Sequence, residues 1–473
     1  MSRSSPRYRV AISGGGIGGL ALAAFVCQHS KDIAVDIYEM RDIGMEEEVR
    51  KRNLPLPKEG ESRGPIFRKA DQPSEGVDFH NHMLPYGPMS LPRSILLDLV
   101  QTKLTDMCKI HTLKHVISYN ETPEGPIIIQ FKDGSTATAD ILVGCDGVNS
   151  DTRVTMYRKL AKTDPSRGYE SFCKPKWRYN SDFITFVNLR LTTDIVYSGQ
   201  LAYRAAVQKS KVSELYPNHQ ALDQVKIWCG KNKVGRVFLF VVEPISNLLQ
   251  HAVTHPFGQL IHVICYYNEE GGYGKAFTGP KVTDVSTAEL VEHFQNWELD
   301  LINVLKVIIG RALDYGALIV LAVCRQVIEK PSRWAIHVID QLPHSVTGHV
   351  ALLGDAAHAM TPHQGVGGGQ AIEDAHILGR LLAHDKTTVE SLKEVLKIYD
   401  AIRLPLAQMA AEGSWIIGLL YDCIHPDHPV TGDTTAEELE SLGVALQDAL
   451  AWLGKGGCDQ DWNEAEARLS QLG

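Results

Sequence analysis

The fold is decided by the stretch Gly348-His-Val-Ala-Leu-Leu-Gly-Asp-Ala-Ala-His-Ala-Met-Thr-Pro-His-Gln-Gly-Val-Gly-Gly-Gly-Gln-Ala-Ile-Glu-Asp374. Its apolar run Val350–Leu353 predicts a buried strand, and Asp355 follows at the carboxyl end, where ligands of open α/β sheets bind. The glycines between Gly365 and Gly369 leave backbone N–H groups uncovered at the start of a helical pattern. Such amides suit an electron-rich ligand, through hydrogen bonds and the helix dipole.

A second signature lies near the amino end of the chain. Two predicted strands, Tyr8–Ser13 and Ile33–Tyr38, flank a glycine-rich turn and an Ala/Leu-rich helix, which is the context that gives a G-x-G-x-x-G its meaning. The predicted roles are the turn for Gly14, approach of a pyrophosphate for Gly16, helix packing for Gly19 and ribose binding for Glu39. An acid at Glu39 favours an unphosphorylated ribose, as in FAD or NAD, whereas the alternative is a purely structural turn.

A third signature follows a predicted hairpin. The strands Ile127–Phe131 and Ala137–Val143 flank Asp133-Gly134, a dipeptide typical of tight turns. The second strand leads into Asp140-Ile-Leu-Val-Gly-Cys-Asp-Gly-Val-Asn-Ser-Asp-Thr-Arg153.

Together the three signatures resemble those of the FAD-dependent aromatic hydroxylases, and Met360–Ala375 is most similar to the fungal salicylate-hydroxylase-like branch. The resemblance implies an α/β fold with a Rossmann-like FAD-binding domain, an inserted β-sheet substrate domain and a helical C-terminal region. It implies an FAD-dependent monooxygenase that uses NAD(P)H and O2 to hydroxylate a phenolic or aromatic-carboxylate small molecule through a flavin hydroperoxide. Because only one good dinucleotide fingerprint is present, NAD(P)H is expected to bind transiently as a co-substrate.

The resemblance also implies roles for single residues. Asp355 would bind the ribityl chain of FAD, and Asp146 and Gly147 would lie at its pyrophosphate region. Pro362 and the amides of Gly365, Gly367 and Gly368 would lie along the isoalloxazine. Arg93 would contact FAD from the start of a helix. For the substrate, Arg204 would hold a phenolate or carboxylate, and His255 would replace a family tyrosine and take the phenol proton. Two alternatives remain open, namely a surface ion pair for Arg204 and, for His255, a place in the core with its hydrogen bonds satisfied by the protein.

The order of the signatures divides the chain into predicted parts. We expect an FAD-binding domain in two segments, 1–158 and 337–405, with the substrate domain at 159–336 and the helical region at 406–473. In that last region, Ala410–Leu420 predicts an apolar helix, and Thr434–Glu437 predicts a capping box for a helix through Leu453. The tail predicts packing or a homodimer contact.

Composition excludes several other classes of protein. The chain has 473 residues, 44% of them hydrophobic, and a formal charge of −9 without a basic block, so nucleic acid is not an expected partner. The nine cysteines are scattered without zinc spacing, which favours a reducing compartment and predicts no metal site. No apolar run is long enough for a membrane span, and a strand pattern already at Tyr8 leaves no secretory signal, so we expect a cytoplasmic protein.

Three segments depart from the family pattern. After Gly44 a charged run, Glu46–Arg52, replaces the usual glycine-containing loop, and the stretches 234–250 and 310–325 have no recognised counterpart. Charges are costly to bury against a flavin, so the first departure predicts an exposed ring and poorly coupled turnover. Two alternatives to a hydroxylase therefore stay open, a flavin oxidoreductase that only dehydrogenates and a catalytically impaired flavin- or metabolite-binding relative.

Overall fold

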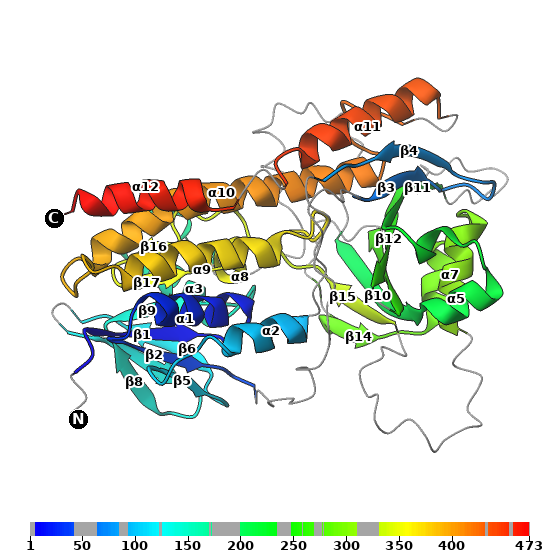
Figure 1. Cartoon of the computed structure of the whole chain (residues 1–473). Coiled ribbons are helices and arrows are strands. Elements are labelled where there is room, and N and C mark those ends of the chain that lie inside the picture. Colours follow the sequence, from blue (N-terminus) through cyan, green and yellow to red (C-terminus); the bar gives the residue numbers. More distant parts are fainter. Residues whose placement is uncertain are drawn as a thin grey trace, which may run out of the picture.

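The computed structural model describes residues 5–41, 64–84, 93–122, 125–169, 172, 199–233, 247–257, 259–268, 277, 279–309, 331–430, 434–453 and 457–472. In Figure 1 one sheet lies beside a bundle of helices, a second sheet stands apart from it, and a long helix runs along both. The charged run after Gly44 and the stretch 310–325 lie outside the described residues, as does most of 234–250.

The first sheet has six strands in the order β16-β17-β9-β1-β2-β5. Its strands are β1 (Tyr8–Ser13), β2 (Ile33–Tyr38), β5 (Cys108–His111), β9 (Ile141–Gly144), β16 (Val346–Thr347) and β17 (Val350–Leu352). All neighbours pair in parallel except β16 with β17. The strands predicted at Tyr8–Ser13 and Ile33–Tyr38 are therefore confirmed, and the one predicted at Val350–Leu353 is one residue shorter.

Two layers cover this sheet. One face packs on α1 (Ile17–His29), α9 (Gly367–Ala383), α10 (Leu392–Tyr421) and α12 (Asp459–Ser470). The other face packs on α3 (Asp151–Thr163) and on a small sheet of β6 (Val116–Asn120), β7 (Ile127–Phe131) and β8 (Thr136–Ala139). Apolar residues run almost all round α1, and such a helix is stable only when it is buried.

The predicted strand Ala137–Val143 is wrong as a single element. Its first part, β8, pairs antiparallel with β7, as the predicted hairpin requires, but its second part, β9, pairs in parallel with β1 in the large sheet. The chain changes sheets at Asp140, whose side chain accepts a hydrogen bond from the Arg9 N–H at 2.7 Å. Apolar alternation alone does not say which sheet a strand joins, so the break left no signal.

The second sheet has eight strands in the order β14-β15-β10-β13-β12-β11-β3-β4. They are β3 (Ile66–Lys69), β4 (Val77–Asn81), β10 (Gln200–Gln208), β11 (Lys226–Lys233), β12 (Asn247–Phe257), β13 (Leu260–Asn268), β14 (Val282–Asp284) and β15 (Ser332–Ala335). One face packs on α5 (Lys209–Leu215), α6 (Thr287–His293) and α7 (Leu299–Ile309). Strands β3 and β4 come from the segment 1–158, so that predicted segment is not confined to the first sheet.

The helical C-terminal region differs from its prediction in three places, one of which is that α11 (Ala436–Leu450) ends three residues before the predicted Leu453. In place of a helix that begins after Pro405, α10 runs without interruption from Leu392 to Tyr421, since burial of residues on both sides of Pro405 outweighs its missing N–H. The capping box lies one residue later than predicted, because Thr435 caps α11 (Ala436–Leu450) and Glu438 returns the bond. The remaining helices are α2 (Arg93–Gln101) and α8 (Asp355–His358).

The predicted fold class is confirmed, with an α/β nucleotide-binding sheet, a second sheet and C-terminal helices. The exact domain bounds remain a prediction.

Candidate flavin and substrate site

The three sequence signatures meet along one edge of the six-stranded sheet. Strands β17, β9, β1 and β2 are consecutive and parallel, so their carboxyl ends lie side by side. Asp355, Asp146, Gly14 and Glu39 follow these four ends in that order. Strands lie about 4.8 Å apart, so the row spans roughly 15 Å, the scale of an extended dinucleotide.

The turn after β1 has room only for glycine at two points. Gly14 has φ +104°, and a Cβ there would overlap the carbonyl oxygen of Cys145 in the neighbouring turn. A Cβ on Gly19 would overlap the carbonyl oxygen of Gly14, so its absence lets α1 pack close to the turn. Gly16 precedes the first residue of α1, whose bare amides point to the row of strand ends.

Glu39 is half-buried where β2 ends. Its carboxylate accepts hydrogen bonds from the backbone N–H of Gly15 at 2.8 Å and of Arg41 at 2.9 Å. The strand end and the glycine turn are thereby tied together, and the acid is fixed where the ribose of a nucleotide would lie.

Asp146 follows β9, and one of its oxygens is satisfied inside the protein. Oδ2 accepts bonds from the Thr152 N–H at 3.1 Å and the Thr152 hydroxyl at 2.9 Å. Oδ1 is buried and has no hydrogen-bond partner among the described residues. Burial raises the pKa of Asp146 although the bonds from its neighbours oppose the shift, which suits a carboxyl group that meets a ligand. Gly147 follows with φ +77° and open space where a Cβ would be.

The turn after β17 carries the predicted flavin residues. Gly354 has φ +63° and precedes Asp355, which is exposed at the first position of α8. Beyond Pro362, Gly365 has φ +71° and nothing lies within 4 Å of the position of a Cβ. Gly367 and Gly368 begin α9, and a Cβ on either would meet its nearest neighbour only at 3.9 or 3.8 Å. Neither packing nor a positive φ requires glycine at Gly367 and Gly368, so the residues present fit a flat ligand laid against their amides.

Arg93 begins α2, as predicted, and its contact with FAD remains a prediction.

Arg204 and His255 lie on the same face of the second sheet. Arg204 of β10 is level with Ile264 of β13, which is level with Val253 of β12, two residues before His255. Because side chains alternate along a strand, Arg204 and His255 point to the same side, with their Cα atoms roughly 12 Å apart. The structure thus places both predicted substrate residues on one face but separates them by strand β13.

Trp334 fixes the guanidinium of Arg204. Trp334 belongs to the adjacent strand β15 and is level with Ala202 of β10. The Arg204 Cζ lies 4.8 Å from the centroid of the indole ring. The Trp334 N–H donates to the Ser332 hydroxyl at 2.8 Å. The Arg204 Nε is buried without a hydrogen-bond partner among the described residues, so this arginine is held by stacking and retains donor capacity.

A buried aromatic cluster joins this face to the flavin loop. His251 of β12 donates from Nδ1 to Asp422 Oδ1 at 2.7 Å, and its ring stacks on Tyr266 at 4.5 Å. His363, next to Pro362 in the loop, lies with its ring centroid 5.0 Å from those of His251 and Tyr266. Burial lowers the pKa of both histidines, so both are neutral rings. The loop and the substrate face are therefore in direct contact.

Sequence reasoning missed His251, Tyr266 and Trp334 as parts of this site. A signal for His251 was present, because it stands four residues before His255 and an extended strand puts both on one face. For Tyr266 and Trp334 the strand partners had to be known first.

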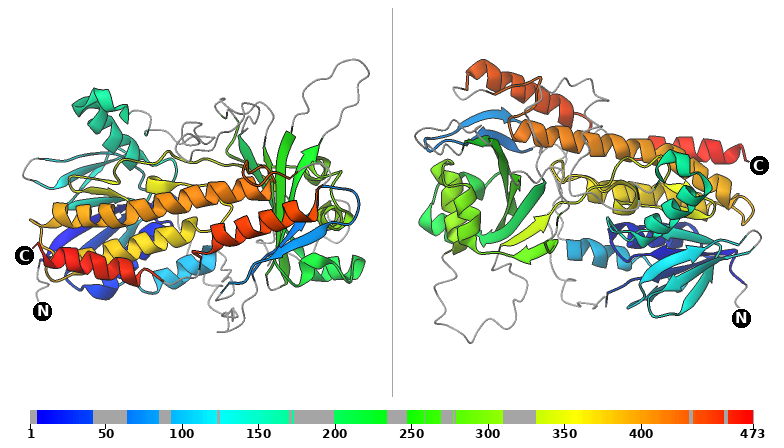
Figure 2. Two further views of the ribbon diagram at one scale, coloured as in Figure 1. Left: turned by 90° about the horizontal axis from the view of Figure 1, so that it is seen from above. Right: turned by 180° about the vertical axis from the view of Figure 1, so that it is seen from behind.

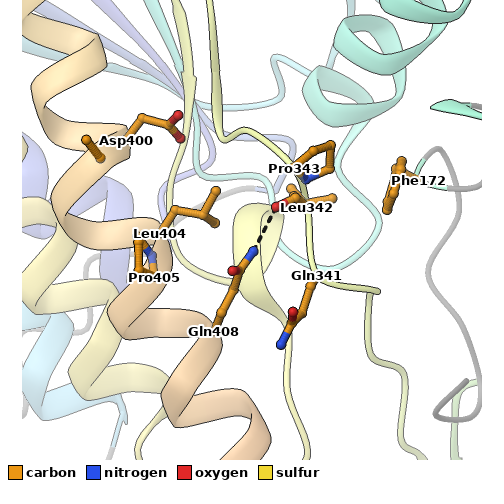
Figure 3. A pocket seen from close by; sticks show the side chains of 9 residues that line it. Phe172, Gln341, Leu342, Pro343, Asp400, Leu404, Pro405 and Gln408 are labelled. Atoms are coloured by element: carbon orange, nitrogen blue, oxygen red, sulfur yellow. Dashed lines mark hydrogen bonds between the residues drawn. The ribbon is translucent and has the colours of Figure 1, made fainter. Parts of the chain in front are cut away.

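The hollow drawn in Figure 3 is separate from this site. It measures about 500 Å³ and lies between Phe172, the segment before β16 and the middle of α10. Two of its polar side chains already have partners, since Gln408 donates to the Leu342 carbonyl at 2.7 Å and Asp400 accepts from the Ser345 hydroxyl at 2.6 Å.

The described part of the chain has two further properties. Within it, no three His, Cys, Asp or Glu side chains gather closely enough to hold a metal ion. None of its helices has both the length and the hydropathy needed to cross a membrane.

The chain is similar to known flavin-dependent proteins in sequence and in fold. A family model described as FAD binding domain matches residues 325–414. The FAD-dependent monooxygenase str9 of Strobilurus tenacellus is 27% identical over 98% of this chain and 97% of its own length. A salicylate hydroxylase of Pseudomonas putida is 28% identical over 99% and 97%. A solved salicylate hydroxylase substrate complex shares the fold with a TM-score of 0.72, at 23% identity and 98% coverage of both chains.

Proposed function

Since the chain belongs to the family of FAD-dependent aromatic hydroxylases and is an FAD-dependent monooxygenase, we propose that it hydroxylates a phenolic or aromatic-carboxylate small molecule with NAD(P)H and O2. When bound, FAD supplies the oxygen chemistry, after reduction by NAD(P)H. The protein must hold the cofactor, orient the ring of the substrate and make it electron-rich.

The carboxyl edge of the first sheet would hold FAD. Glu39 would bind the adenosine ribose, the turn from Gly14 to Gly16 would meet the pyrophosphate, and Asp355 would bind the ribityl chain. The amides from Gly365 to Gly368 would lie along the ring. The support for this assignment is the order of the strand ends and the open space around these glycines.

The face of the second sheet would bind the substrate. Arg204 would donate charge-assisted hydrogen bonds to a carboxylate or phenolate, which raises the electron density of the ring. Burial, with a smaller contribution from His262, lowers the pKa of His255, so its imidazole is neutral at neutral pH and able to accept the phenol proton. The observation that carries the proposal is the stacked, half-buried Arg204 on the face that meets the flavin loop.

Arg204→Gln tests this proposal, with Arg333→Gln as the matched control. Arg333 lies on the adjacent strand, but its side chain points to the other face, where it pairs with Glu289 at 3.0 Å. With salicylate as probe, Arg204→Gln should raise KM about tenfold or more and still retain the flavin. Arg333→Gln should retain the flavin and leave KM unchanged. Normal hydroxylation by the variant would place substrate anchoring elsewhere.

Product analysis separates hydroxylation from simple dehydrogenation. The wild-type protein, assayed against a panel of phenolic and aromatic acids, should release a hydroxylated product with consumption of NAD(P)H. An enzyme that oxidises its substrate without adding oxygen would instead support the second class of flavin enzyme.

A further inference from the structure

The turn that carries Asp355 is held from behind by a buried carboxylate. Asp374, on α9 and fully buried, accepts a hydrogen bond from the Gly354 N–H at 3.2 Å. The same oxygen accepts one from His358 Nε2 at 2.6 Å. Gly354 has the left-handed backbone of φ +63°, so the direction in which Asp355 leaves the sheet depends on this anchor.

Arg403 of α10 holds Asp374 in turn. Its Nε donates to the other oxygen of Asp374 at 2.9 Å, and its Nη2 donates to the Gln370 side chain at 2.8 Å. The Arg403 side chain is 1% exposed. A charge at this depth is tolerated only when every donor is used, because water cannot replace a lost partner.

The remaining nitrogen of Arg403 is satisfied by the C-terminal helix. Nη1 donates to Asp461 Oδ2 of α12 at 3.1 Å. A second contact fixes the same helix, since the Arg380 guanidinium of α9 lies 3.7 Å from the Trp462 ring centroid. Figures 1 and 2 show α12 alongside α9 and α10 at this end of the molecule. The tail is thus joined to the flavin motif by consecutive contacts.

We propose that Asp461 and Arg403 are positioning residues for FAD. In this arrangement Asp461 orients Arg403, Arg403 orients Asp374, and Asp374 fixes the Gly354–Asp355 turn. Loss of Asp461 would leave one buried nitrogen of Arg403 unpaired. The guanidinium would then shift toward Glu373, which already lies 3.1 Å from Nη2, and away from Asp374.

The test is the FAD affinity of Asp461→Asn, measured by quenching of flavin fluorescence on titration of the FAD-free protein. This nearly isosteric change keeps an accepting oxygen but removes the charge that holds Arg403, so it should weaken binding about fivefold, the effect of one partly exposed ion pair. Glu464→Gln is the control, because Glu464 lies on the same helix in an exposed pair with Arg468 and should leave affinity unchanged. Thermal midpoints of the FAD-free proteins show whether each variant folds.

A double-variant comparison separates positioning from general packing. If Asp461 acts through Arg403, Asp461→Asn should add nothing to the loss of FAD affinity in Arg403→Gln. If α12 only stabilises the fold, Asp461→Asn should lower the thermal midpoint and leave the dissociation constant for FAD unchanged. Affinity of Asp461→Asn within twofold of Glu464→Gln, or additive losses in the double variant, would overturn the proposal.

Discussion

Replacing Gly368 by alanine should stabilise the FAD-free protein and weaken its binding of FAD. Gly368 is the second residue of α9 and exposed, and a Cβ there would meet only Ile17 Cδ1, at an ordinary 3.8 Å. Glycine in a helix costs about 0.5–1 kcal/mol relative to alanine, so Gly368→Ala should raise stability by up to this amount. In the protein without ligand, this glycine has no packing reason to be there.

The effect on FAD has the opposite sign. If the ring lies against these amides, the added methyl group separates it from them and overpacks the contact, at a cost of about 1–3 kcal/mol. The dissociation constant for FAD should therefore rise about fivefold to a hundredfold. Thermal unfolding of the FAD-free protein measures the first effect, and titration with FAD measures the second.

Gly379→Ala provides a control on the same helix. A Cβ at Gly379 would lie 2.6 Å from Phe25 Cβ, so this change should lower stability through the contact of α9 with α1 and leave FAD affinity nearly unchanged. If Gly368→Ala binds FAD as tightly as wild type, the flavin does not lie on the start of α9. The present assignment of the glycine loop would then be wrong.

Three further results are expected. Glu39→Gln should weaken FAD binding, since the neutral amide is a poorer acceptor for the Gly15 N–H and for a ribose hydroxyl; unchanged affinity in a folded variant would mean that another acid binds the ribose. Trp334→Leu should raise KM for an aromatic acid about two- to fivefold with little change in kcat, and Trp334→Phe should partly restore it, because stacking orients Arg204; equal KM in the two variants would remove that role. Burial opposes the charged form of His358, but its partner Asp374 raises the pKa of His358 above the usual value. The stability that this ion pair contributes is therefore complete below about pH 6.5 and is lost as pH rises through the raised pKa. The difference in unfolding free energy between wild type and His358→Asn should shrink over that rise, and a constant difference would contradict this role.

Short sequence motifs were sufficient to predict the structure where the motif itself contains the residues that require a conformation. The turn at Gly14 needs a positive φ and a close approach of Cys145, and the glycine pattern announces both. The same holds for β1, α1, β2 and the start of α9, which all begin or end at such turns. The position of the three signatures along one sheet edge could also be predicted, because parallel strands bring their carboxyl ends together.

Long-range pairing left no comparable signal. Strand β3 pairs in parallel with β11, so Ile66 is level with Lys226, and nothing near Ile66 indicates a partner so distant in the chain. His251 and Asp422 are 171 positions apart, yet form a fully buried pair. Sequence patterns predict which residues prefer burial, but the identity of the buried partner depends on the assembled fold.

Helix α10 crosses the domain bound predicted after Pro405, and a break there would be incompatible with this site. Before the proline, Arg403 supports the turn of the flavin motif, and after it Tyr421 and Asp422 pack against His251 on the substrate face. A continuous helix fixes the distance between these two ends at about 1.5 Å per residue, whereas a flexible joint at Pro405 would let them move independently. The proposed hydroxylation requires the substrate ring and the flavin at a set separation, and a continuous helix provides it at the cost of one helical hydrogen bond. The second sheet and the flavin loop are thus kept in register by a helix that contacts both.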